Sequence, residues 1–148
     1  MRSPLLSRDR VVILKSRDKT EVLTELVDLL SSLPEVEDRS ELLRAILQRE
    51  EDLSTAMGFG FAVPHAKIFS VRDFVMAVGL SREGIEFDAI DGKPVHLVVM
   101  IAGPIDRQRR YLQLLSQIMT ILRDEEKRRL LTGSCDPEVV YGILKEMK

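Results

Sequence analysis

The residues with the clearest chemical potential lie in one stretch, Ser54–Lys67, in which a glycine-containing loop leads through a short apolar segment to a histidine. Gly58 and Gly60 allow backbone angles that a side chain would forbid. Pro64 fixes its own φ and keeps the preceding residue extended, so His65 has little conformational freedom. A rigid mount at the end of a strand suits a side chain that titrates near neutral pH and can act as a nucleophile.

The alternative for His65 is a packed or half-exposed histidine without chemistry, because titration near neutral pH permits chemistry and does not require it. The other histidine, His96, alternates with apolar neighbours in a predicted strand, and we interpret it as structural. Two histidines without carboxylates or cysteines at matching spacing do not predict a metal site. Cys135 is the one cysteine; it cannot form an internal disulfide and has no activating group beside it in the sequence.

The stretch resembles the active-site segment of the enzyme IIA domains of the mannitol, fructose and nitrogen-regulatory class, from the bacterial phosphoenolpyruvate:sugar phosphotransferase system. In that family a Ser-Thr and glycine-rich loop leads through a short apolar strand to Pro-His, and the histidine carries the phosphoryl group. An arginine stands sixteen positions before the histidine, as Arg49 does here. The resemblance runs from about Leu5 to the C-terminus, and the other matching residues are Ser54, Thr55, Gly58, Gly60, Pro64 and His65.

The resemblance implies that His65 accepts a phosphoryl group and that Arg49 stabilises its charge. Phosphoryl transfer depends mainly on positioning and charge stabilisation, which a guanidinium and backbone amides can provide. The resemblance therefore assigns a phosphate-binding role to the loop with Ser54, Thr55, Gly58 and Gly60, whose amides at 58–60 would be donors. The alternative for Arg49 is a solvated arginine in a charged run. The Ser54 and Thr55 hydroxyls would then only form a turn, and Gly58 and Gly60 would belong to an ordinary loop.

Tyr111 is the main departure from the family, which usually has a second histidine at this position. Its hydroxyl can donate a hydrogen bond to a phosphoryl oxygen or to an imidazole, but it cannot carry positive charge. The alternative is that Tyr111 only packs. Ala66 replaces the usual glycine after the histidine, and Ala56 and Phe59 replace small or polar loop residues.

Two functions from different classes follow from these residues. In the first, the protein is a phosphocarrier that receives phosphate from an HPr-like carrier and passes it to a IIB partner or holds it as a signal, without a metal or organic cofactor. In the second, it is a non-enzymatic regulatory module of the same fold that binds a transporter, kinase or regulator. His65 and Arg49 favour the first, and Tyr111 favours the second. The absence of an attached IIB or IIC domain favours a regulatory or stand-alone subunit in both.

The bulk composition is that of one globular domain over residues 1–148, with 45% apolar and 31% charged residues. A net charge of −2 argues against general electrostatic binding of nucleic acid. No apolar run approaches the roughly 18 residues that a membrane span needs, which excludes direct membrane insertion. Together with the single cysteine, this predicts a cytoplasmic protein.

Apolar periodicity predicts an α/β fold, a three-layer sandwich with a mixed central sheet flanked by helices. The predicted strands are 11–14, 61–63, 74–80, a short strand at 85–87 between turns at Glu83-Gly84 and Asp91-Gly92, and 95–102. The predicted helices start after the cap Asp18 and near Asp38 or Ser40, span 106–123 and 124–131, and start again after Asp136. The 106–123 helix has apolar residues around more than half of its circumference and is expected to be deeply buried.

Overall fold

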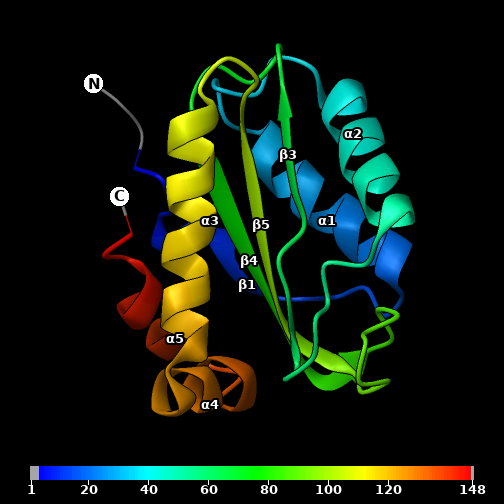
Figure 1. Ribbon diagram of the computed structural model, residues 1–148, viewed down its shortest axis with the longest axis vertical. Coiled ribbons are helices and arrows are strands. Elements are labelled where there is room, and N and C mark those ends of the chain that lie inside the picture. Colours follow the sequence, from blue (N-terminus) through cyan, green and yellow to red (C-terminus); the bar gives the residue numbers. More distant parts are fainter. Residues whose placement is uncertain (1–3, 148) are drawn as a thin grey trace.

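The computed structural model describes residues 4–147 and has the predicted α/β architecture, with one mixed sheet between two layers of helices (Figure 1). In chain order the elements are the 3-10 turn η1 (Arg8–Arg10), β1 (Val11–Ile13), α1 (Lys19–Ser31), α2 (Arg39–Asp52), β2 (Phe61–Ala62), β3 (His65–Ile68), β4 (Val75–Ile85), β5 (Val95–Pro104), α3 (Gln108–Arg123), α4 (Glu125–Gly133) and α5 (Pro137–Leu144).

The sheet has the order β1-β4-β5, with β2 and β3 following one another along the outer side of β5. β4 and β5 form the long antiparallel centre, and β1 pairs with β4 in parallel. β2 and β3 both run parallel to β5, in registers that place Phe61 opposite Leu97 and His65 opposite Ile101. The site histidine therefore lies on an edge of the sheet, at the first residue of β3.

Alternation along the two central strands divides the apolar residues between two cores. One core lies under α1 and α2 and takes Val75, Ala77, Val98 and Met100 from the sheet. The other lies under α3, α4 and α5 and takes the alternate residues of β4 and β5: Met76, Val78, Leu80, Leu97, Val99 and Ile101. Figure 1 shows the two helical layers on opposite sides of the strands. This burial of both sheet faces was predicted from the continuous apolar strands.

The predicted helix starts are confirmed by side-chain caps. Asp18 accepts from the Glu21 amide at 2.9 Å, and Asp38 accepts from the Glu41 amide at 3.0 Å. Asp136 accepts in the same way at the start of α5, where Pro137 takes the first helical position and has no amide to satisfy. Each cap supplies an acceptor for an amide that the helix itself leaves unpaired.

The separate strand predicted at 85–87 is wrong, because β4 continues from Val75 to Ile85. Gly84 has φ +88° and lies in an irregular part of β4, between the pair Leu80–Leu97 and the pair Ile85–Val95. Glycine can take this left-handed conformation without a side-chain clash, so the strand bends there instead of ending. Gly92, with φ +70°, lies in the turn predicted at Asp91-Gly92.

The expectation that 106–123 is deeply buried is also wrong. α3 buries one stripe, Tyr111, Leu114, Ile118 and Leu122, whereas Leu112 is 53% exposed. The helix packs on one side of the sheet only, so half of its circumference faces outward. Within residues 4–147, no helix combines the length and the apolar character that crossing a bilayer requires.

Candidate functional site

His65 is held by a break in the edge strand. Pro64 separates β2 from β3, and its carbonyl accepts from the Ile101 amide at 3.0 Å, which keeps this segment on β5. Proline has no amide to donate, so it is tolerated at an edge. The Val63 carbonyl lies 2.7 Å from Nδ1 of His65. The strand end thus fixes both the backbone and the ring of this histidine.

The hydrogen bond to Val63 defines the tautomer of His65. A carbonyl oxygen can only accept, so Nδ1 carries the proton and Nε2 keeps its lone pair. Burial lowers the pKa of His65 below its ordinary value of 6.5, and the charge of Arg49 lowers it further, against the opposing effects of the Val63 hydrogen bond and Glu50. The ring is therefore neutral at neutral pH, with Nε2 free to act as a nucleophile.

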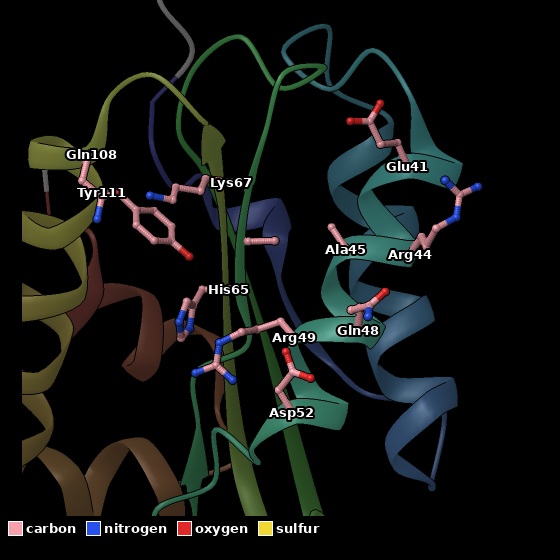
Figure 2. A pocket seen from close by; sticks show the side chains of 11 residues that line it. Glu41, Arg44, Ala45, Gln48, Arg49, Asp52, His65, Lys67, Gln108 and Tyr111 are labelled. Carbon is pink, nitrogen blue, oxygen red and sulfur yellow. The ribbon is translucent and has the colours of Figure 1, made fainter.

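Arg49 lies in the last turn of α2 and reaches the His65 ring from the other side of the edge strand (Figure 2). Its Nη1 donates to the Leu53 carbonyl at 2.9 Å, which ties the guanidinium to the segment that follows the helix. A guanidinium has five N–H donors, so donors remain for an anion. The structure thus brings Arg49 and His65 together as predicted.

Tyr111 approaches the same histidine from the first turn of α3. The two ring centroids are 5.8 Å apart, and the Tyr111 ring also stacks on Phe74 at 6.5 Å. The side chain is 7% exposed, and burial raises the pKa of Tyr111 to about 12, so the phenol keeps its proton at neutral pH. Figure 2 shows its hydroxyl pointing toward β3. The phenol can therefore act as a neutral donor near His65.

A surface pocket of about 590 Å³ opens between α2, β3 and α3 and contains His65, Arg49 and Tyr111 (Figure 2). Its other lining residues are Glu41, Arg44, Ala45, Gln48, Asp52, Ala66, Lys67 and Gln108. None of these residues was predicted from the sequence to line the site. The three- and four-residue spacing of Glu41, Arg44, Gln48 and Asp52 was a signal that they share one face of the helix, and Arg49 follows Ala45 at the same spacing. Strand alternation was a signal that Lys67 shares a face with His65.

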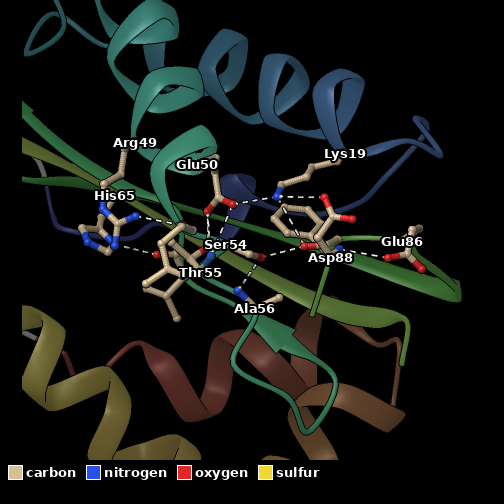
Figure 3. Close-up of polar contacts among 12 residues, drawn as sticks. Lys19, Arg49, Glu50, Ser54, Thr55, Ala56, His65, Glu86 and Asp88 are labelled. Carbon is tan, nitrogen blue, oxygen red and sulfur yellow. Dashed lines mark hydrogen bonds and ion pairs between the residues drawn. The ribbon is translucent and has the colours of Figure 1, made fainter. Parts of the chain in front are cut away.

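Ser54 and Thr55 belong to a polar network behind the pocket (Figure 3). The Ser54 hydroxyl donates to the Phe87 carbonyl at 2.7 Å and accepts from a loop amide. The Thr55 amide and hydroxyl both donate to the buried carboxylate of Glu50, which also pairs with Lys19 at 2.9 Å. These contacts attach the loop after α2 to the start of α1, so both hydroxyls have internal partners in this structure.

The structure does not bring Gly58 and Gly60 to His65. They line a different pocket, with Asp91 and His96, near the first residues of β5. β2 pairs with β5 at Leu97, and β3 pairs with β5 at Ile101. These two positions are four residues apart, which is about 13 Å at the rise of a strand. The amide of Phe59 between the two glycines donates to Asp91 at 3.1 Å. The loop predicted to supply phosphate donors therefore lies outside the pocket of His65.

The remaining candidates for chemistry lie outside the pocket. His96 contacts the Ser81 carbonyl through Nδ1 at 2.9 Å, as a structural histidine would. Cys135 is a half-buried free thiol. Among residues 4–147, no three histidine, cysteine, aspartate or glutamate side chains are grouped so that they could hold a metal ion. The geometry thus brings a neutral imidazole, an arginine and a buried phenol together at His65.

Comparison with known proteins agrees with this fold. The family model described as "Phosphoenolpyruvate-dependent sugar phosphotransferase system, EIIA 2" matches residues 4–147, and the chain belongs to this family. The fructose-specific EIIA component of Haloferax volcanii is 38% identical over 122 residues, which are 82% of this chain and 79% of the relative.

Relatives of other lengths and names are also similar. The fructose-specific EIIABC component of Bacillus subtilis is 35% identical over 133 residues, 90% of this chain, but the match spans only 21% of that longer protein. The crystal structure of the nitrogen regulatory protein IIA-Ntr from Neisseria meningitidis superimposes with a TM-score of 0.84 at 28% identity, over 95% of this chain and 96% of the other. Similarity therefore extends to both sugar-specific and regulatory members of the family.

Proposed function

We propose that this protein is a phosphocarrier in which Nε2 of His65 accepts a phosphoryl group from an HPr-like carrier protein. The observation that carries the proposal is the contact between Nδ1 of His65 and the Val63 carbonyl, which leaves the Nε2 lone pair free in a pocket beside Arg49. The lowered pKa of His65 supports it, because a protonated imidazole has no lone pair with which to attack phosphorus.

The transfer step needs only the residues of this pocket and the donor. Nε2 attacks the phosphorus of the donor phosphohistidine, a new P–N bond forms, and the P–N bond to the donor ring breaks. The electron pair of the broken bond remains on the donor nitrogen, and Nδ1 of His65 keeps its proton against Val63. Arg49 stabilises the charge on the transferring group, which is the main contribution that a protein makes to phosphoryl transfer.

The onward acceptor in this proposal is a IIB domain or a regulatory target, and the transfer takes place in the cytoplasm. The relatives with fructose-specific and nitrogen-regulatory names support these two routes equally. A second function, a regulatory module of the same fold with weak or no phosphorylation, is favoured by one observation. Tyr111 offers the His65 pocket a neutral phenol in place of the family's second imidazole.

One experiment separates the two functions. The wild-type protein is incubated with phosphoenolpyruvate, enzyme I and HPr, and its intact mass is measured before and after mild acid. We expect one acid-labile phosphate on the wild type and on the control His96→Ala, and none on His65→Ala. Label that persists in His65→Ala would falsify the assignment, and a wild type that takes no label would overturn the phosphocarrier proposal and favour the regulatory module.

A further inference from the structure

We propose that Lys67 is a further phosphoryl-binding residue: its ammonium group contacts the phosphoryl group on His65 and supplies the positive charge that Tyr111 lacks. The inference rests on the proposed function, because it concerns the same phosphoryl group. It is carried by the position of Lys67 on the strand of His65, by its contact with Tyr111, and by the absence of a carboxylate of residues 4–147 within ion-pair distance.

The backbone places Lys67 on the same face of β3 as His65. Ala66 and Ile68 are buried in the core under α1 and α2, whereas His65 and Lys67 alternate with them and are half-buried on the opposite side. Residues two apart on a strand have Cα atoms about 6.6 Å apart and parallel side-chain directions. Both side chains line the same pocket, as Figure 2 shows.

Tyr111 fixes the position of the Lys67 ammonium group. Nζ lies 5.4 Å from the centroid of the Tyr111 ring, whose electron-rich face attracts a cation. The same ring is 5.8 Å from the ring of His65, so lysine, phenol and imidazole form one cluster. An aromatic platform of this kind limits the freedom of a long side chain before any anion arrives.

The charge of Lys67 is not neutralised within residues 4–147. The ion pairs of that part of the chain do not include Lys67, whereas Lys19, for example, is bound to the buried carboxylate of Glu50. The pocket thus presents an unpaired ammonium next to a nucleophile. A phosphorylated histidine is an anion with three acceptor oxygens, and a charged donor binds such a group more strongly than a neutral one.

We infer that Tyr111 and Lys67 both donate hydrogen bonds to the phosphoryl group, and that Lys67 is the one of the two that carries a positive charge. The phenol of Tyr111, with its pKa of about 12, donates a neutral hydrogen bond. Lys67 provides the cation from β3, whereas Arg49 enters the pocket from α2 (Figure 2). Tyr111 in the position of the family's second histidine is therefore compatible with a stable phosphohistidine at His65.

The test compares Lys67→Met with Lys93→Met, which removes the same charge from the other pocket, at Gly58 and Gly60. Each protein is equilibrated with a phosphorylated HPr-type carrier, and the phosphorylated fraction is measured by intact mass. The equilibrium constant depends only on the free proteins, so a change in carrier docking alters the rate and leaves this constant unchanged. We expect about a tenfold lower constant for Lys67→Met, the scale of one charge-assisted hydrogen bond, and no change for Lys93→Met.

A phosphorus NMR titration of the phosphorylated proteins gives a second readout that does not depend on the carrier. A nearby cation favours the dianion, so the phosphoryl pKa should rise in Lys67→Met, stay unchanged in Lys93→Met and remain near the wild-type value in Lys67→Arg. Adding Tyr111→His to Lys67→Met should recover most of the lost phosphorylation by restoring a cation. If Lys67→Met does not fold, Lys67→Gln is measured in the same way.

Failure of this inference is distinct from failure of the proposed function. Equal equilibrium constants and equal phosphoryl pKa values in wild type and Lys67→Met, with phosphate still on His65, would overturn the role of Lys67 alone. A wild type without phosphate on His65 would overturn both.

Discussion

The buried ion pair behind the site predicts a large loss of stability when its lysine is removed. The Glu50 side chain is 3% exposed, and its Oε2 lies 2.9 Å from Nζ of Lys19. The substitution Lys19→Met keeps most of the side-chain length and removes the charge. It leaves the Glu50 carboxylate buried, and within residues 4–147 its remaining donors are the amide and hydroxyl of Thr55.

The structure sets the expected magnitude. Removing one partner of a buried ion pair costs about 3–5 kcal/mol. The value here should fall near about 3 kcal/mol, because the Lys19 side chain is 19% exposed and the two Thr55 contacts remain. With a urea dependence of roughly 2 kcal/mol per molar, the unfolding midpoint should fall by about 1.5 M. The double variant Lys19→Met with Glu50→Gln buries no charge and should recover at least half of that loss.

Equilibrium urea unfolding followed by circular dichroism measures these midpoints. The matched control is Arg129→Met, which breaks the exposed pair between Arg129 and Glu125 on α4 and should leave the midpoint nearly unchanged. A midpoint for Lys19→Met equal to that of Arg129→Met would refute the reasoning. So would a double variant less stable than Lys19→Met, because the uncompensated Glu50 charge would then not be the source of the loss.

Three further predictions concern the pocket itself. Arg49→Lys and Arg49→Ala should both slow phosphoryl transfer, by roughly tenfold or more for alanine, and their unfolding midpoints should stay close to wild type. Equal transfer rates in stopped-flow measurements of the three proteins would mean that Arg49 is only surface charge. Tyr111→Phe should lower the equilibrium phosphorylation about fivefold, the scale of one neutral hydrogen bond, and an unchanged intact-mass ratio would assign Tyr111 to packing alone. NMR titration of the His65 ring should give a midpoint below 6.5, moved upward in Arg49→Ala because a repelling cation is lost; a wild-type midpoint at or above 6.5 would contradict the effect of burial.

Local chemistry alone accounts for most of the elements and for the mount of the site histidine. The caps at Asp18, Asp38 and Asp136 act within three residues, so they are visible in the sequence. The alternation in 75–80 and 97–102 specifies which residues enter each core, and Val95, beyond the irregular part of the β4–β5 pairing, departs from it. The rigidity of His65 follows from Pro64 beside it. The bend at Gly84 was misjudged as a turn, because a positive φ is compatible with both a turn and an irregular strand.

Only the tertiary structure decided which distant residues share the pocket. Arg49 and Tyr111 come from helices on opposite sides of the sheet and meet at His65 because β3 is the edge strand between them. Gly58 and Gly60 are closer to His65 in sequence than Arg49 and Tyr111 are. The segment between the glycines and His65 is extended, however, and it separates them because a strand advances about 3.3 Å with every residue.

Tertiary packing also determines the partners of Glu50, which looks solvated within the run Arg49-Glu50-Glu51-Asp52. Successive residues on a helix point about 100° apart, so one carboxylate of that run turns inward to Lys19 and Thr55 while its neighbour Arg49 faces the pocket. The four-residue spacing of Leu42, Ile46 and Glu50 already places Glu50 on the buried stripe of α2. Which residues Glu50 meets there depends on how α2 packs against the rest of the fold, and no local pattern in the sequence contains that information.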